Sequence, residues 1–466
     1  MLAKIALRNI FRNRRRSTVT GLAVAVGATA LLVFGAFQAY VFAGLQTGIV
    51  QRSGHLTVFR DGYFLFGAGN PAAYGIDDYK SVMRLIADDS ALKPLINVMT
   101  PTLSLFGIAG NFEGGHDAAK TFFGVGVVPS DRERMRQWNE FGAGRPYEPD
   151  AKLTDADPTR GFVGVGLARI LGLCARLGVP NCPAPPDAPP DPSAEANAGP
   201  PQDFSDLTRR DIRPTAAGAL PRLDLLGATA GGAPNVLSLY VSGAEAQPAR
   251  ELDDSFVAMH LELAQQLLYG RGEHKVTGIV IQLHHSADLG RVRAHLVGLF
   301  KSHNLPLDVR DFTELAPQYG QIVGFFSAIF LFIAVIMGVI VLFTVVNTMT
   351  MAVMERTNEI GTTRALGVRR AGIRRQFLLE GWMLGAIGAS VGVALAFLIA
   401  FAANHANLSW TPPGNVTSVP LRLYLSGRWP LLGGTWLGLV VVATLASLFP
   451  ANRAARLPVV DALRHV

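Results

Sequence analysis

Four stretches without a charged side chain constrain this chain more than any other feature of its sequence. They are residues 17–51, residues 320–354, residues 381–421 apart from His405, and residues 429–452. Each exceeds the roughly 20 residues that a helix needs to cross a hydrocarbon core about 30 Å thick. Buried helices of soluble proteins are usually shorter and keep a polar edge. The sequence therefore predicts an α-helical membrane protein with four transmembrane helices, at residues 17–50, 320–352, 376–404 and 430–450.

Basic side chains are distributed unevenly around these spans. Fifteen lie before the first span, between the second and third, or after the fourth, whereas the loop at residues 405–429 has two. Short loops rich in Lys and Arg stay in the cytoplasm. Both termini, including the tail 451–466, are therefore predicted to be cytoplasmic, and residues 51–319 extracytoplasmic. The net charge of +7 fits this topology and contact with anionic membrane lipid, without any nucleic acid.

Residues 1–16 have the pattern of an amphipathic helix that lies on the membrane surface. Lys4, Arg8 and Arg12 recur every four positions between apolar residues. We predict that these three side chains anchor the helix at the membrane interface. The alternative is a disordered basic tail that serves only as a topology signal. A cleaved signal peptide fits poorly, because the apolar run that follows is too long.

Residues 51–319 have the composition of a large α/β domain inserted between the first and second spans. Alternating or β-branched runs predict strands at residues 55–59, 121–128, 237–241 and 277–283. Helical periodicity is found at residues 81–92, 163–173, 253–268 and 289–302. Residues of about 181–233 include a stretch of mainly Ala, Pro and Asp, and they are predicted to be a mobile insertion.

The two cysteines of the chain, Cys174 and Cys182, are eight positions apart. In an extracytoplasmic domain this spacing allows a small disulfide loop. Two free thiols are the alternative. No metal site is predicted near them.

Catalytic signals are scarce. The chain has no Gly-Lys dipeptide, which excludes a Walker A loop, so any ATP that drives this protein is hydrolysed by another chain. The pattern G-x-S-x-G at residues 388–392 falls inside a predicted span and is best explained by chance. Its glycines Gly388 and Gly392, together with Gly381 and Gly385, have the spacing that lets transmembrane helices pack closely. No catalytic residue, metal or bound cofactor is predicted.

The first and second spans are unusually long. The uncharged residues 320–354 would form a helix of about 52 Å, well beyond the hydrocarbon core. Because these two helices flank the external domain, they are candidate levers between the cytoplasm and that domain.

The predicted cytoplasmic loop 353–375 carries a polar and apolar pattern. Glu355 and Glu359 are one helical turn apart, with Arg356 and Arg364 nearby and Ile360 and Leu366 available for apolar contacts. This segment is either a helix that docks in a groove of another protein or a solvated connector.

Several segments resemble the MacB/LolCDE/FtsX-type ABC permeases. They are ALRNIFRN at residues 6–13, the charged loop at residues 355–367 with ER, EIG and RALG, FLLEG at residues 377–381, and the ending at residues 450–464. Short segments at residues 54–58, 166–173 and 251–253 are similar to the lipoprotein-releasing LolC and LolE. The chain thus resembles stand-alone permeases of this kind most closely, and its external domain corresponds to their MacB-like core domain.

The resemblance implies a function in the bacterial inner membrane. A separate cytoplasmic ABC ATPase dimer would use ATP and Mg²⁺ and engage a coupling helix formed by Glu355, Arg356, Glu359, Ile360, Gly361, Arg364, Ala365, Leu366 and Gly367. The permease would work with a second copy or a related permease. Its periplasmic domain would move to export or release a hydrophobic or lipidated substrate, with a periplasmic carrier, adaptor or lipoprotein as a further partner. The alternative is a mechanotransmission regulator that activates a cell-envelope enzyme or signalling partner without transport.

Overall fold

The structure is a computed structural model of the chain. It describes residues 6, 8–9, 12, 14–67, 71, 73–113, 118–143, 153–180, 182, 220–247, 249–270, 274–406, 408–410 and 418–459. Lys4, most of the insertion predicted at residues 181–233, and residues 460–466 of the predicted tail lie outside the described residues.

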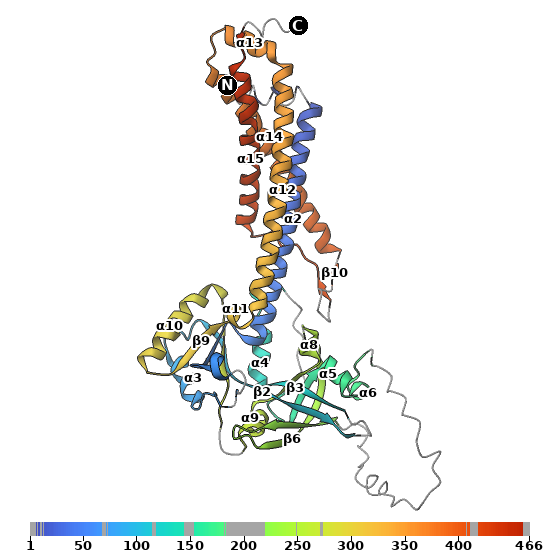
Figure 1. The fold of residues 1–466 in the computed structure, drawn as a ribbon, viewed down its shortest axis with the longest axis vertical. Helices are drawn as coiled ribbons and strands as arrows, with labels where there is room; N and C mark the ends of the chain where they lie inside the picture. The colour runs from blue at the N-terminus through green and yellow to red at the C-terminus, as the bar shows by residue number, and fades with distance from the viewer. Residues whose placement is uncertain are drawn as a thin grey trace, which may run out of the picture. The chain divides into compact units, whose positions relative to one another are not determined.

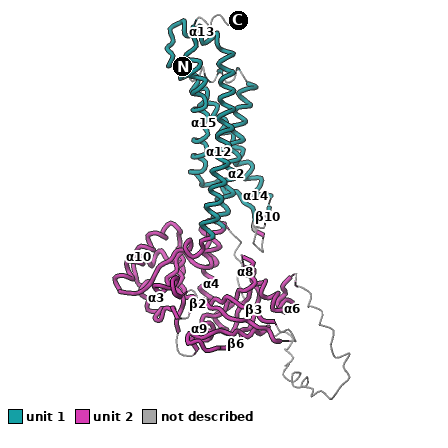
Figure 2. Tube along the Cα trace, viewed as in Figure 1, with its two compact units in different colours: residues 1–44, 318–409, 420–466 teal, residues 45–317, 410–419 magenta. Residues whose placement is uncertain are grey.

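The chain divides into two compact units (Figure 2). Unit 1 comprises residues 1–44, 318–409 and 420–466, and unit 2 comprises residues 45–317 and 410–419.

Unit 1 consists mainly of long helices (Figure 1). Its helices are α2 (Arg14–Ser53, whose last residues belong to unit 2), α12 (Pro317–Glu355), α13 (Thr357–Ala365), α14 (Arg370–His405) and α15 (Trp429–Arg456). All except α13 are long and apolar enough to cross a membrane, and each of the four contains one predicted span. Each helix is longer than its predicted span, because the helical backbone continues through flanking charged residues. The loop between α14 and α15 contains the short strands β10 (Ser409–Trp410) and β11 (Val419–Pro420).

Helix α14 approaches α15 closely at two glycines. A Cβ atom on Gly381 would lie 2.6 Å from the Cβ atom of Ser447, and one on Gly385 would lie 2.8 Å from that of Ala443. Both distances are too short for a side chain without movement of the neighbouring helix. The two glycines are one turn apart, so they place one face of α14 against α15.

The next two glycines of α14 face a different helix. A Cβ atom on Gly388 would lie 2.7 Å from the Cβ atom of Val24, and one on Gly392 would lie 2.5 Å from the carbonyl oxygen of Ala25. Val24 and Ala25 belong to α2. The four predicted packing glycines therefore let α14 contact two helices at close range.

Unit 2 contains a nine-stranded mixed sheet in the order β3-β7-β4-β6-β5-β2-β8-β1-β9. Its strands are β1 (Leu56–Arg60), β2 (Ile96–Asn111), β3 (Ala118–Val127), β4 (Arg160–Gly164), β5 (Arg222–Ala228), β6 (Pro234–Glu245), β7 (Phe256–His260), β8 (Gly278–Leu283) and β9 (Leu307–Asp311). The pairs β3–β7 and β4–β6 are parallel, and the other pairs are antiparallel.

The long strand β2 belongs to both parts of this sheet. Its residues 96–102 pair with β8, whereas its residues 103–111 pair with β3. Since β5 also pairs with β2, the strands β2, β3, β7, β4, β6 and β5 close a ring of pairings.

The helices of unit 2 are short. They are α3 (Tyr79–Asp88), α4 (Pro129–Arg136), α5 (Val165–Ile170), α6 (Cys174–Leu177), α8 (Arg250–Asp253), α9 (Leu261–Tyr269), α10 (Leu289–Ser302) and α11 (Phe312–Leu315), with a π-helical turn at Tyr63–Gly67 and a 3₁₀ turn at Ser286–Asp288. Leu105, Phe122 and Leu225 point to the buried face of the ring, where they form one core with residues of α9.

Two predicted elements of unit 2 are wrong. Residues 253–268 form no single helix, because β7 and α9 follow the end of α8. The carboxylate of Asp253 accepts hydrogen bonds from the backbone N–H groups of Val165, Gly166 and Gln247. These bonds fix the end of α8 and direct the backbone into β7, where a continuous helix was predicted. The helix predicted at residues 163–173 begins later, since residues 163–164 end β4.

Part of the predicted mobile insertion is also corrected. Residues 222–228 form β5, which pairs with both β2 and β6. The turn that follows is closed by a hydrogen bond of 2.8 Å from the Thr229 N–H to the Ala233 carbonyl. These residues therefore belong to a β-hairpin of the sheet.

Cys174 and Cys182 form a disulfide, one of the two states that the sequence allowed.

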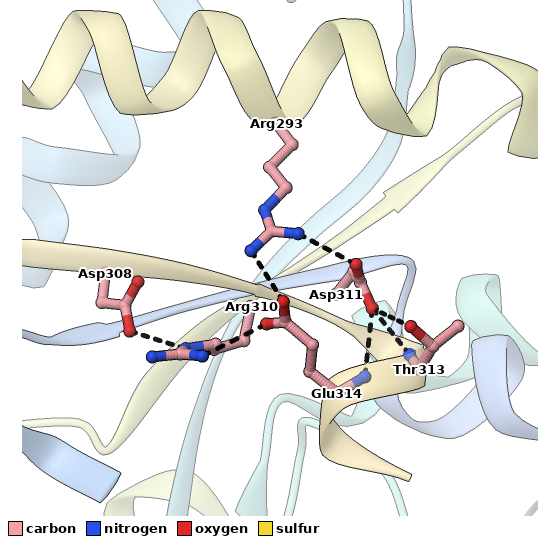
Figure 3. Close-up of polar contacts among 6 residues, drawn as sticks. All are labelled: Arg293, Asp308, Arg310, Asp311, Thr313 and Glu314. Atoms are coloured by element: carbon pink, nitrogen blue, oxygen red, sulfur yellow. Dashed lines mark hydrogen bonds and ion pairs between the residues drawn. The ribbon is translucent and has the colours of Figure 1, made fainter. Parts of the chain in front are cut away.

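Alternating charges join α10, β9 and α11 (Figure 3). Arg293 donates hydrogen bonds to Asp311 at 3.1 Å and to Glu314 at 2.8 Å. Arg310 forms ion pairs with Asp308 at 2.7 Å and with Glu314 at 3.5 Å. The carboxylate of Asp311 also caps the N-terminus of α11 by accepting two backbone N–H groups. This network fixes α11 on the sheet just before α12 begins.

Candidate functional site

The charged loop singled out in the sequence folds as a short helix between two long ones. Arg356 is the N-cap of α13 and follows directly after Glu355, the last residue of α12. Beyond the end of α13, Gly367 has a φ angle of +94°, a conformation that side chains with a Cβ atom rarely adopt. This glycine lets the chain turn back into α14.

A buried ion pair fixes the start of α13. The Nη1 atom of Arg356 lies 3.2 Å from the Oε1 atom of Glu380 in α14, and only 7% and 5% of the two side chains are exposed. Asn9 completes the cluster, because its side-chain amide donates to Glu380 at 2.6 Å and its carbonyl accepts from Arg356 at 3.2 Å. A buried charge pair holds its geometry well when such additional hydrogen bonds are present.

Two exposed ion pairs connect the chain around α2 to the same loop. Arg12 pairs with Glu359 of α13, and Arg16 of α2 pairs with Glu355 at 2.7 Å. Exposed pairs of this kind contribute at most about 1 kcal/mol each. Of the predicted interface anchors, Arg12 thus contacts α13, Arg8 is exposed, and Lys4 lies outside the described residues.

The far end of α13 is held by the end of α15. Ile360 is buried, with 5% of its surface exposed, and packs in the core of the bundle. The guanidinium of Arg364 donates hydrogen bonds to the carbonyl oxygens of Ala455 at 3.1 Å and Leu457 at 2.9 Å. A cation is favourable there because the last carbonyl groups of a helix have no partners within it.

The tip of this loop is apolar and exposed. Leu366 has 82% and Val368 has 40% of its surface exposed, and Ala365 and Gly367 are exposed as well. Four exposed arginines follow, at positions 369, 370, 374 and 375. The structure thus places the predicted coupling residues in three groups. Arg356, Ile360, Gly361 and Arg364 hold the helix, and Glu355 and Glu359 form the exposed ion pairs. Ala365, Leu366 and Gly367 protrude. Such a surface suits the docking of another protein.

Sequence reasoning missed two members of the buried cluster, Asn9 and Glu380. Glu380 had a detectable signal, because it is an acidic residue at the start of a long apolar span, where an ionisable side chain normally has a partner. Asn9 lies in the segment ALRNIFRN that carries the family resemblance, but nothing in the sequence indicates its contact with Glu380, which is 371 positions away. Within the described residues, no three His, Cys, Asp or Glu side chains are grouped to hold a metal ion.

Comparisons with known proteins bear on the same region. Residues 330–459 match the family model of the FtsX-like permease C-terminal domain, and this range contains α13, α14, α15 and most of α12. The macrolide export ATP-binding/permease protein MacB of Rhodopirellula baltica is 30% identical to this chain over 215 residues. The chain therefore contains a segment that matches the FtsX-like permease domain, and it is similar to MacB-type ABC permeases. The resemblance to that family is confirmed.

Further relatives of this permease agree. MacB of Vibrio parahaemolyticus is 29% identical over 194 residues, and the ABC transporter permease YtrF of Bacillus subtilis is 34% identical over 137 residues. The alignments cover 44%, 41% and 28% of this permease for the three relatives, but only 25%, 28% and 30% of the relatives themselves. The permease therefore spans less than a third of the length of these relatives. Special closeness to LolC and LolE stays a prediction.

Proposed function

We propose that this permease is the membrane subunit of an ATP-driven assembly in the bacterial inner membrane. A separate ABC ATPase dimer binds the exposed tip of α13 in the cytoplasm and uses ATP and Mg²⁺. Unit 2 lies in the periplasm and acts on a hydrophobic or lipidated substrate, which is exported or released. The observation that carries this proposal is a helix held at both ends whose Leu366 is 82% exposed.

The contacts around α13 supply a route for motion. Arg356 is one residue beyond α12 and is bonded to Glu380 of α14, so a displacement of α13 acts on both long helices. Arg364 adds the end of α15. Because these contacts are buried or capped rather than loose, α13 moves with the helix ends and not independently of them. Long helices then carry the motion along their axes.

An apolar surface in unit 2 supports a hydrophobic substrate. Phe106, Ile108, Leu226 and Val236 point to the outer face of the strand ring, with 55%, 42%, 37% and 57% of their surfaces exposed. Ile108 lies opposite Leu226, and Leu226 lies opposite Val236, so three of them form a row across β2, β5 and β6. A row of exposed apolar side chains of this kind marks an interaction surface. The names of the MacB relatives also refer to export, in their case of macrolides.

The proposed assembly contains further partners. A second copy of the chain or a related permease completes the membrane part, as in the lipoprotein-releasing permeases that the sequence resembles. A periplasmic carrier or an adaptor receives the substrate, or a lipoprotein is itself the substrate. The alternative function is activation of a cell-envelope enzyme or signalling partner without transport. Measurement of substrate release distinguishes the two functions.

The test compares two leucines of equal exposure. Leu366→Asp changes the tip of α13, and Leu65→Asp makes the same change at a residue of unit 2 with 80% exposure. The permease is reconstituted in liposomes with the ATPase that copurifies with it, and ATP hydrolysis is measured with and without the permease. We expect Leu366→Asp to abolish the change in ATPase rate, because a carboxylate cannot enter an apolar groove without desolvation. Leu65→Asp should leave it intact.

Equal ATPase behaviour of the two variants would contradict docking at α13. Substrate release is measured separately, by identifying the molecules that leave the liposome membrane during ATP hydrolysis. Release of a lipid or lipoprotein supports transport. ATP-dependent activation of an added envelope hydrolase, with no release, assigns the regulatory function instead.

A further inference from the structure

A groove of about 730 Å³ lies between α2 and α12, at the end of these helices that carries the Arg16–Glu355 ion pair. It is separate from the exposed tip of α13. Thr348 of α12, which lines the groove, shares a hydrogen bond of 2.6 Å with the hydroxyl group of Thr20 in α2. This bond joins the two helices beside the groove.

The outer end of the groove is basic and incompletely paired. Arg15 and Arg16 both line it. One nitrogen of Arg16, Nη2, donates to Glu355 at 2.7 Å. The other, Nη1, is buried and has no hydrogen-bond partner among the residues that the structure describes. Two arginines against one glutamate leave this end of the groove positively charged, which favours an anionic oxygen at the exposed parts of the two guanidinium groups.

Polar and apolar side chains share the groove below the arginines. Val19 and Met351 lie at shallower depth than Asn347, and Phe343 lies one turn deeper. Arg16 precedes Thr20 by one turn, so Asn347, the neighbour of Thr348, lies about 8 Å deeper along the helices than Arg16. Asn347 is exposed in the groove, one turn from Phe343 and one turn from Met351. An exposed amide inside a membrane is costly unless it is hydrogen-bonded. A ligand that is anionic at one end, carries ester oxygens and ends in hydrocarbon matches the two arginines, the Asn347 amide and Phe343.

We propose that this groove binds a phospholipid with an anionic headgroup. The phosphate contacts Arg15 and Arg16, an ester carbonyl accepts a hydrogen bond from the Asn347 amide, and an acyl chain continues past Asn347 along Phe343. The Phe343 side chain is 67% exposed, and Val19, beside the glycerol part of the lipid, is 64% exposed. The site requires that α2 and α12 lie in a membrane, but it does not depend on ATPase binding at α13.

Native mass spectrometry of the full chain in mild detergent measures this binding. Phosphatidylglycerol is titrated against phosphatidylcholine, which has the same glycerol ester but no net charge. A basic side chain near an anionic lipid contributes a factor of about five in affinity. We therefore expect Arg15→Gln with Arg16→Gln to weaken phosphatidylglycerol binding about 25-fold and to leave phosphatidylcholine binding unchanged.

Two matched variants separate the groove from general surface charge. Arg374→Gln with Arg375→Gln removes an adjacent, exposed pair of arginines outside the groove and should leave binding unchanged. Glu355→Gln removes the acidic partner of Arg16 and should retain or strengthen binding. An equal loss with the 374/375 pair would overturn the proposal, since the lipid would then respond only to total charge.

A free phosphate is the other source of the same chemistry. Inorganic phosphate that displaces phosphatidylglycerol at equal concentration would show that the acyl chain contributes nothing, and would overturn a lipid site. If the arginine variant fails to fold, Val19→Trp fills the groove without changing its charge and should also displace the lipid. Disulfide crosslinks between two copies through Val19→Cys and Phe343→Cys would show that protein covers the groove, and would also overturn the proposal.

Discussion

Replacing Glu380 by leucine should destabilise the helix bundle strongly. The change leaves the guanidinium of Arg356 buried, with 7% of its side chain exposed, and removes its carboxylate partner at 3.2 Å. Only the Asn9 carbonyl, at 3.2 Å, remains as a partner among the contacts described above. Breaking a buried ion pair by removing one partner costs about 3 to 5 kcal/mol.

The double variant provides the control for this prediction. Arg356→Met with Glu380→Leu removes both charges and keeps most of the volume, so the free energy of unfolding should return to within about 1 kcal/mol of the original value. Glu380→Gln, which keeps the shape and part of the hydrogen bonding, should fall between the two. These differences define a double-mutant cycle with a large interaction energy.

Unfolding of the purified permease in mixed micelles of mild detergent and sodium dodecyl sulfate measures these free energies. A loss below 1 kcal/mol for Glu380→Leu, or additive losses in the double variant, would refute the buried pair as the anchor of α13.

Three further predictions concern packing, protonation and the disulfide. Gly392→Leu should cost about 1 to 3 kcal/mol of unfolding free energy in the same assay, because its Cβ atom would meet α2 at 2.5 Å, whereas Gly438→Leu, with nothing within 4 Å, should be neutral. Burial lowers the pKa of His55 to about 4. The unfolded chain therefore binds more protons between pH 4 and 6.5, and unit 2 should lose about 3 kcal/mol as the pH falls through this range. The free energy of unfolding is measured as a function of pH from the tryptophan fluorescence. His55→Asn should remove its dependence on pH in this range, and an unchanged dependence would show that other groups cause it. Replacing Cys174 and Cys182 by serine should lower the unfolding free energy by about 2 kcal/mol in denaturant titrations, and a neutral effect would show that the loop adds no constraint.

The membrane part of the fold was predictable because its signal is local. A run of uncharged residues identifies a span without knowledge of its neighbours, and the amphipathic helix α10 (Leu289–Ser302) begins and ends where its periodicity does. β2 gave no comparable signal. Its residues 96–111 include Pro101 and two glycines, and its pairing depends on strands far away in the sequence. β7 was mistaken for helix because its apolar residues also fit a helical period, while parallel pairing with β3 decides its state.

The candidate site also has one part that the local sequence predicts and one part that depends on packing. The α13 segment carries its own charges and a glycine at the turn, so it could be recognised from residues 355–367 alone. Its anchoring could not, because Glu380 and Asn9 meet Arg356 only after the helices pack. The distinction between residues that hold α13 and residues that protrude from it likewise needs burial, which no local pattern gives for Ile360 and Leu366.

Docking of an ABC ATPase on α13 is tested most directly with a photo-crosslinking amino acid at position 366 of the permease, in its native membrane. The same amino acid at position 65 is the control, since both leucines are about 80% exposed. After irradiation, crosslinked proteins are identified by mass spectrometry. We expect an ABC ATPase attached at position 366 and not at position 65. Crosslinks from position 366 to lipid alone, or to no ATPase, would contradict docking of an ATPase on α13.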